Sequence, residues 1–263
     1  MGEDKQLLKV IGKGSFGTVY LSKSIDTHRL HAIKKVPKID DESNNFEKKI
    51  AEVLPPHPNI VGYLGSYEDE QFTYLSFQYV EGMDLFTYME SRHFTPLSEK
   101  RAHKLFSQLF RAISHLHTNN VVHLDIKLEN LMLNGKGNLV VIDFGRSLVV
   151  PSEDHLITEY SGSMDYVSAE IITQKPYSGS KADLYACGVI LYTLLFAGFP
   201  YTQEERYQLL VDENAHQPLQ FPLDASSDVK DLLSRLLAND PSKRMSVKEL
   251  SKHKWMRKKL WWF

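Results

Sequence analysis

A chain of 263 residues is long enough for one large domain or two closely packed lobes, and too short for an array of small modules. Hydrophobic residues make up 42% and charged residues 24%, a globular composition that excludes intrinsic disorder and collagen-like repeats. The 31 Lys and Arg residues against 33 Asp and Glu give a net charge of -2, so no overall basic field attracts nucleic acid.

The first 80 residues favour β-strands. Short runs of β-branched and aromatic residues occur at 10–11, 19–21 and 30–33, and further runs follow at 62–67 and 72–80. Between these two groups Glu47, Ile50 and Leu54 fall on one face of a predicted helix, which Pro55-Pro56 ends.

From about residue 98 the hydrophobic period becomes helical and continues to Asn119-Asn120. The apolar residues with this period are Ala102, Leu105, Phe106, Leu109, Ile113 and Leu116. Near the C-terminus, residues 246–249 form a capping box, and Met245 is expected to pack on Leu250. We therefore expect a small strand-rich lobe over about 1–80 and a larger helical lobe over about 81–263.

Neither the N-terminus nor the longest apolar stretch predicts export or a membrane span. The first six residues lack the apolar core of a signal peptide. Residues 184–200 contain two glycines and fall short of the roughly 20 residues that span a bilayer, so we expect a buried core helix there and no transmembrane segment. The single Cys187 can form no internal disulfide, which fits a reducing compartment, cytoplasmic or nuclear.

Three glycines, Gly12, Gly14 and Gly17, have the spacing that lets backbone N–H groups lie close over phosphates. In a dinucleotide-binding motif a helix would follow the last glycine, whereas here residues 18–21 continue as a strand, so we predict a β-hairpin flap. Lys34 ends the next β-favouring run, where its side chain can reach a bound anion. Considered alone, Lys34 is more readily interpreted as a solvated lysine at a strand end, like its neighbour Lys35.

Two further motifs follow in the chain. Residues 123–130 read His-Leu-Asp-Ile-Lys-Leu-Glu-Asn, and residues 140–145 read Val-Val-Ile-Asp-Phe-Gly. With Asp183 inside the apolar helix and Asp240-Pro241 before Arg244, the chain resembles a eukaryotic protein kinase catalytic domain from about residue 7 to 255. The resemblance implies a single kinase domain over 1–263 with a bilobal α+β fold: a small antiparallel β-rich N-lobe with one main helix, and a mostly helical C-lobe.

The resemblance also implies ATP and Mg²⁺ as cofactors, because phosphoryl transfer requires positioning and neutralisation of a polyanion. Asp125 would accept the proton of the substrate hydroxyl, Lys127 would balance charge on the γ-phosphoryl group, and Ser163 would hydrogen-bond both. Asn130 and Asp143 would provide oxygen ligands for Mg²⁺. The nucleotide-binding residues implied by the resemblance are Ile11, Gly12, Gly14, Gly17, Val19, Ala32, Lys34, Glu47, Gln78, Val80 and Asp84.

Several of these assignments have competitors. Glu47 is the favoured helix partner of Lys34, but Glu52 lies on the same predicted helix, and either could be surface charge. Phe77 would be the gatekeeper, with backbone groups of Gln78 and Val80 contacting adenine. Asp84 could bind the ribose or equally cap the helix that begins at residue 85. Glu129 with Asp84 would favour a basic residue upstream of the acceptor, whereas Glu129 alone reads as a solvated carboxylate.

The sequence departs from the family pattern at several positions. Leu124 replaces an arginine that grips an activation-loop phosphate, and Glu159 stands where the phosphorylated Thr is often found. Together they predict a loop that needs no phosphorylation at that site, the alternative being drift in a poorly constrained loop. Leu128 replaces a proline, and residues 168–170 read Ser-Ala-Glu. Glu170 is still expected to pair with Arg244.

Lysine two residues after the catalytic aspartate resembles the Ser/Thr-directed pattern, and the motifs at 123–125, 176–178 and 188–192 look most like the calmodulin-dependent kinase group. We expect a Mg-ATP-dependent Ser/Thr kinase that phosphorylates a protein substrate; the alternative is a pseudokinase scaffold without catalysis. The basic, aromatic stretch 252–263 could bind a calmodulin-like regulatory protein, or simply pack on the large lobe as the end of the last helix.

Overall fold

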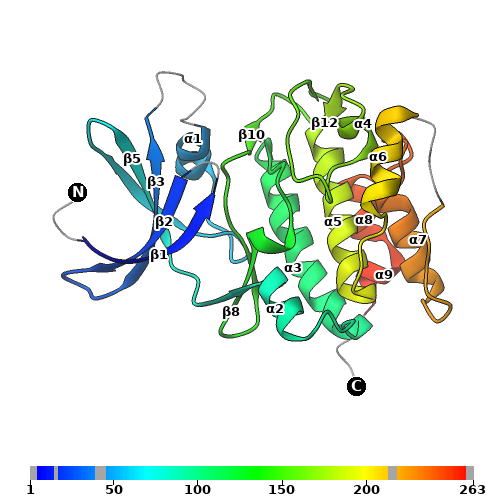
Figure 1. The fold of residues 1–263 in the computed structure, drawn as a ribbon, viewed down its shortest axis with the longest axis horizontal. Helices are drawn as coiled ribbons and strands as arrows, with labels where there is room; N and C mark the ends of the chain where they lie inside the picture. The colour runs from blue at the N-terminus through cyan, green and yellow to red at the C-terminus, as the bar shows by residue number, and fades with distance from the viewer. Residues whose placement is uncertain (1–4, 15–16, 39–45, 213–217, 259–263) are drawn as a thin grey trace.

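The computed structural model describes residues 5–14, 17–38, 46–212 and 218–258, which form a sheet-containing lobe and a helical lobe (Figure 1). The sheet of the first lobe has five antiparallel strands in the order β1-β2-β3-β5-β4. They are β1 (Lys5–Gly14), β2 (Gly17–Ser24), β3 (Leu30–Pro37), β4 (Tyr63–Glu68) and β5 (Phe72–Gln78). This architecture confirms the predicted bilobal α+β fold.

Strands β1 and β2 form the predicted hairpin, with Gly14 opposite Gly17 at its closed end. Gly17 has a φ of +142°, and a Cβ there would lie 2.2 Å from the carbonyl oxygen of Lys35, so no other residue fits without moving the backbone. Residues 15 and 16, which belong to the glycine motif, lie outside the described residues.

Helix α1 (Phe46–Val53) is the main helix of the first lobe and contacts β4. Its buried residues are Glu47 and Ile50, which lie on the predicted face. The amide of Leu54 still donates to the carbonyl of Ile50 at 2.9 Å before the two prolines begin. The predicted helix and its end are therefore confirmed.

The second lobe is built around two long helices, α3 (Glu99–Thr118) and α5 (Gly179–Phe196). Ser98 caps α3 by accepting from the amide of Arg101, and Asn119 follows its last turn, as predicted. The shorter helices are α2 (Leu85–Ser91), α4 (Ala169–Ile172), α6 (Gln203–Val211), α7 (Ser227–Leu236), α8 (Val247–Lys252) and α9 (Lys254–Arg257).

Helix α5 is the predicted core helix, and most of its residues are buried on every side. It begins five residues earlier than the apolar run, because Ser178 caps it by accepting from the amide of Lys181. At Gly188 an added Cβ would lie 2.9 Å from the Cβ of Leu236, so the glycine permits close packing against α7. Among the described residues, no helix is long and apolar enough to cross a membrane.

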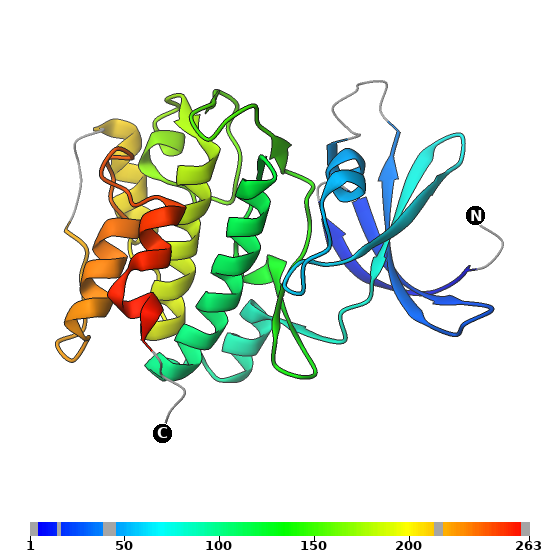
Figure 2. The same cartoon turned by 180° about the vertical axis from the view of Figure 1, so that it is seen from behind.

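The last helices confirm the predicted capping box. The described part of the C-terminal stretch packs on the large lobe, which was one of the two alternatives for it. Ser246 and Glu249 bond reciprocally at the start of α8, and Met245 and Leu250 are buried in one core cluster. The view from behind shows α8 and α9 over the helices of the large lobe (Figure 2), where fully buried Trp255 donates to Glu99 of α3 at 2.9 Å. Residues 259–263 lie outside the described residues.

The remaining strands are short and pair with one another in three small sheets. One three-stranded sheet contains β6 (Gly82–Asp84), β8 (Leu131–Asn134) and β9 (Leu139–Val141); the two strand pairs are β7 (Val121–Val122) with β10 (Leu148–Val149) and β11 (Leu156–Ile157) with β12 (Tyr177–Ser178). Val141 of β9 also exchanges backbone hydrogen bonds with Asn59 and Val61, at 2.8 and 3.0 Å. The chain before β4 is thereby fixed to the large lobe.

Candidate active site

Lys34 lies at the centre of a three-residue charge cluster, in which Lys34 and Glu47 are buried and Asp143 is partly exposed. Its Nζ donates to Glu47 Oε2 and to Asp143 Oδ1, both at 2.7 Å. These residues come from β3, α1 and the loop after β9, which lie far apart in the sequence. The structure pairs Lys34 with Glu47, while Glu52 is exposed on the same helix.

The surroundings keep Lys34 and Asp143 charged. Burial lowers the pKa of Lys34, but the neighbouring Glu47 and Asp143 carboxylates outweigh it, so the net pKa is raised. Burial raises the pKa of Asp143, but the Lys34 ammonium and the hydrogen bonds from Lys34 and the Gly145 amide hold it below its usual value. The cluster therefore presents a fixed cation and a fixed anion at neutral pH.

Asp143 and Asn130 fit the oxygen-ligand chemistry of Mg²⁺. Asp143 has a φ of +63°, its Oδ1 is engaged by Lys34 and Gly145, and its side chain is 37% exposed. The Asn130 Nδ2 donates to the main chain and the side chain of Asp125, at 2.8 and 3.0 Å, which turns the amide oxygen away from Asp125. The Ile142 amide donates to the carbonyl of Asn130 at 3.0 Å and holds the two segments together. An amide oxygen and an ionised carboxylate are suitable magnesium ligands.

Asp125 lies next to the residues that the sequence grouped with it. Its Oδ2 accepts from Lys127 Nζ at 2.8 Å, and its Oδ1 accepts from Ser163 Oγ at 2.9 Å. Lys127 Nζ also donates to Ser163 Oγ at 3.2 Å, which closes a triangle of contacts. Asp125 is 6% exposed, so its carboxylate is held in one orientation by neighbours from both sides.

Residues 123–130, which the family resemblance identifies as the catalytic loop, are fixed by Asp183 of the buried helix α5. Both carboxylate oxygens accept from the loop, from the amides of His123 and Leu124, each at 2.8 Å. His117 Nε2 of α3 makes a third bond of 2.8 Å to the same carboxylate. The sequence singled out Asp183 only as an acid within an apolar helix; the structure shows that it orients the loop that carries Asp125.

The residues expected around the nucleotide are brought together by the sheet register. Val19 of β2 lies opposite Gly12 on β1 and Lys34 on β3. Ala32 of β3 lies opposite the buried Phe77 of β5. Phe77 is followed in the chain by Gln78 and Val80, whose backbone groups are the ones expected to contact adenine. Ile11 is an exposed apolar residue beside the hairpin glycines, 40% accessible. The sheet register thus places Gly12, Val19, Lys34 and Ala32 on neighbouring strands, with Phe77 opposite Ala32.

The local structure bears on the alternative roles that the sequence left open for Asp84 and Glu129. Asp84 caps α2, with Oδ1 accepting from the Thr87 amide and Oδ2 from the Thr87 hydroxyl, each at 2.8 Å. The capping role is therefore present, and contact with a ribose stays a prediction. Glu129 is exposed, as a solvated carboxylate would be.

Leu124 has a structural role that the sequence did not reveal. It adopts a φ of +62°, is 6% exposed, and belongs to an apolar cluster shared with the loop residues Val150 and Ile157. The other members of the Leu124 cluster are Val122, Val167, Ile171, Ile172, Tyr177 and Ala182. The hydrophobic contacts of Leu124 hold the activation loop, residues 143–170, at the position where the family pattern has an arginine.

Glu159 and Leu128 also have definite surroundings. Glu159 is exposed, and its side chain accepts from the Thr158 amide at 3.3 Å, while its carbonyl accepts from the Tyr177 hydroxyl at 3.1 Å. Backbone hydrogen bonds lower the pKa of Glu159, which favours its charged form. The Leu128 amide donates to the Tyr166 hydroxyl at 3.4 Å, a contact that proline could not make.

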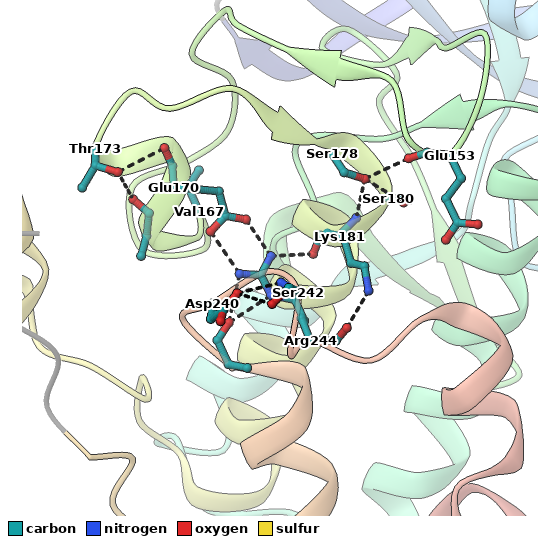
Figure 3. Close-up of polar contacts among 12 residues, drawn as sticks. Glu153, Val167, Glu170, Thr173, Ser178, Ser180, Lys181, Asp240, Ser242 and Arg244 are labelled. Carbon is teal, nitrogen blue, oxygen red and sulfur yellow. Dashed lines mark hydrogen bonds and ion pairs between the residues drawn. The ribbon is translucent and has the colours of Figure 1, made fainter. Parts of the chain in front are cut away.

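Glu170 and Arg244 form the expected buried ion pair (Figure 3). Two parallel hydrogen bonds, of 2.7 and 3.0 Å, join the guanidinium to the carboxylate. Arg244 also donates to the carbonyls of Ala238 and Lys181, and its side chain has no exposed surface. A charge buried this deeply is stable only with such complete pairing.

Comparison with known proteins agrees with this geometry. Residues 6–256 match the family described as "Protein kinase domain". The chain is 36% identical over 249 residues to the mitosis inducer protein kinase cdr1 of Schizosaccharomyces pombe, covering 94% of this chain and 41% of that protein. It is 33% identical to an Aurora kinase of Eremothecium gossypii, covering 97% of this chain and 70% of that protein.

The chain spans well under half the length of two of the relatives, 41% of cdr1 and 30% of a probable serine/threonine-protein kinase of Dictyostelium discoideum. The similarity thus covers only part of those proteins. Since the family match extends over nearly the whole chain, the chain belongs to the protein kinase domain family.

Proposed function

We propose that this chain, as a single kinase domain, transfers the γ-phosphoryl group of ATP to a Ser or Thr hydroxyl of a protein substrate. The observation that carries the proposal is the simultaneous pairing of Lys34 with Glu47 and of Asp125 with Lys127 and Ser163. Phosphoryl transfer depends on positioning and charge neutralisation, and both groups are already formed here.

Each group has a distinct task in this mechanism. When bound, Mg-ATP supplies the phosphoryl group, and the residues that would hold the metal are Asn130 and Asp143. Lys34 binds phosphate oxygens with an ammonium that Glu47 orients. Asp125 accepts the proton of the attacking hydroxyl, and Lys127, 2.8 Å from it, neutralises charge on the group being transferred.

The finer assignments rest on sequence resemblance supported by the site. Lys127 beside Asp125 favours a Ser or Thr acceptor, and the motifs at 123–125 and 188–192 favour the calmodulin-dependent group. Two of the relatives are named as the kinase cdr1 and an Aurora kinase, and neither name mentions that group. The proposal includes regulation by a separate protein and a cytoplasmic or nuclear location. The buried, unpaired Cys187 is compatible with a reducing compartment of this kind.

The rival is a scaffold that binds nucleotide or partners without catalysis. Asp125→Asn tests it, because the amide keeps the size of the side chain and loses the general base. We expect the turnover of a Ser/Thr peptide library to fall by about 10²- to 10⁴-fold. Asp26→Asn, at an exposed turn, is the matched control and should leave turnover unchanged.

Binding and turnover should be measured on the same preparations. Wild-type protein that is stabilised by Mg-ATP but transfers no phosphate to any library peptide would support the scaffold and overturn the kinase. Turnover that survives in Asp125→Asn would overturn the assignment of Asp125 as the base.

A further inference from the structure

Helix α6 contains a buried charge without an acidic partner. Arg206 is 3% exposed, whereas Tyr207, the next residue of the helix, is 65% exposed. One terminal nitrogen of Arg206 donates to the carbonyl of Val167, and its Nε is buried with no hydrogen-bond partner. Within the described parts of the chain, no carboxylate forms an ion pair with this guanidinium.

Such an arrangement does not maximise stability. Arginine stays charged in proteins, and an uncompensated buried charge is unfavourable unless other interactions offset it. Arg244 shows the contrast in the same lobe, because Glu170 and two carbonyls satisfy its guanidinium. Arg206 therefore calls for an explanation other than stability, and its single described partner, Val167, indicates where to look.

Val167 belongs to a short segment, residues 162–168, that contacts the catalytic aspartate Asp125 through Ser163. The Val167 amide donates to the carbonyl of Ser163 at 3.2 Å, and the Ser163 hydroxyl donates to Asp125. Gly162 has a φ of +112°, and a Cβ there would lie 2.5 Å from Cγ1 of Val167, so the two ends of the segment touch. Helix α6 contacts α4, which follows this segment (Figure 1).

We propose that Arg206 is a positioning residue for the protein substrate. By holding the carbonyl of Val167, it fixes segment 162–168 so that Ser163 stays on Asp125 and the acceptor hydroxyl meets the base. The role rests on the proposed kinase function. It concerns the acceptor side only, because none of the described contacts of Arg206 reaches Lys34 or Asp143.

Arg206→Met separates this role from a structural one. Methionine fills similar space without the charge, so the unfolding midpoint should be equal to that of the wild type or higher. The KM for a peptide substrate should rise about tenfold, because a charge-assisted hydrogen bond is lost, while the KM for ATP stays unchanged. Arg206→Lys keeps a donor for the Val167 carbonyl and should recover most of the peptide affinity.

Arg235→Met, on the exposed side of α7, is the matched control and should change neither KM. Hydrogen exchange gives a readout that does not depend on turnover: backbone amides of 162–168 should exchange faster in Arg206→Met than in the control. A lower unfolding midpoint with both KM values raised together would overturn the positioning role in favour of a structural one.

The two proposals fail in different ways. Absence of phosphate transfer in the wild-type protein would overturn the kinase proposal. Transfer with an unchanged peptide KM and unchanged exchange in Arg206→Met would overturn the role of Arg206 alone.

Discussion

The ion pair between Glu170 and Arg244 fixes the end of the activation segment to the loop that precedes α8. Both charges are buried, so removal of one leaves the other without compensation. Arg244→Ala should therefore lower the free energy of unfolding by about 3 to 5 kcal/mol. Because neither residue touches Asp125 or Lys34, the turnover of the fraction that remains folded should stay close to that of the wild type.

Urea denaturation of Arg244→Ala checks this expectation. Arg235→Ala is the comparison, because Arg235 pairs with Glu249 at the surface at 3.4 Å. An exposed pair is worth about 1 kcal/mol or less, so this variant should differ little from the wild type. Equal unfolding midpoints for the two variants would contradict the stabilising role of the buried pair.

At this scale, the motifs of the sequence identified groups that lie close along the chain, and the family resemblance also identified the distant pair of Glu170 and Arg244. Asp125, Lys127 and Asn130 lie within one motif, so their mutual contacts follow from local geometry. The apolar burial of Leu124 could not be predicted in that way, because its cluster draws on residues from 122 to 182 that only the complete fold assembles. The same holds for Arg206, whose proposed role depends on the carbonyl of Val167, 39 positions earlier in the chain.

Among the elements, the loop between α1 and β4 contains a histidine contact between the lobes. The rings of His57 and His115 stack with centroids 4.8 Å apart. His115 Nε2 donates to the carbonyl of Pro55 at 2.8 Å, and His57 Nδ1 accepts from the Asn59 amide at 3.2 Å. Burial, and then the nearby His115 and Arg111, lower the pKa of His57 from its ordinary value of 6.5.

This lowered pKa makes stability depend on pH in a defined direction. In the unfolded chain His57 takes up a proton as the pH falls through about 6.5, whereas in the folded protein it resists protonation. The free energy of unfolding should therefore decrease as the pH falls below 6.5 towards the lower pKa of the folded state. Thermal unfolding at about pH 7.5 and about pH 5.5 measures the effect.

His57→Gln removes the titrating group and keeps an acceptor for the Asn59 amide, so part of the pH dependence should disappear. The matched control is His155→Gln, at an exposed position in the activation loop. If His57→Gln lost as much stability on acidification as the control, the titration of His57 would not contribute.

The elements show where periodic patterns succeed and where they stop. Helix α3 follows from the spacing of its apolar residues, the strands of the first lobe follow from runs of β-branched and aromatic residues, and α8 follows from its capping box. The strands β10, β11 and β12 have two residues each and exist only because partners distant in sequence lie beside them. No local pattern of two residues could have predicted them.

For the molecule as a whole, the Leu124 cluster explains how the activation loop can be ordered without a phosphate. Ile157 is buried in this cluster, and its strand pairs with β12. We therefore expect protein made in bacteria to phosphorylate a peptide at the same rate before and after phosphatase treatment. Leu124→Ala should loosen the loop and lower this rate, because truncation of a buried leucine typically costs about 2 to 5 kcal/mol.

A loss of activity on phosphatase treatment would contradict this expectation. The responsible phosphate would then be sought at Thr158, Tyr160 or Ser161, which lie beside Glu159 in the loop. Substitution of each in turn by alanine would identify it.

The attachment of the catalytic loop to Asp183 has a consequence for the thermal inactivation of the protein. Asp183 belongs to helix α5, most of which is buried, and it accepts hydrogen bonds from the amides of the two residues that precede Asp125. The loop cannot come loose while that helix remains in place. Loss of activity and thermal unfolding of the large lobe should then occur over the same temperature range. No folded but inactive species should accumulate at lower temperatures.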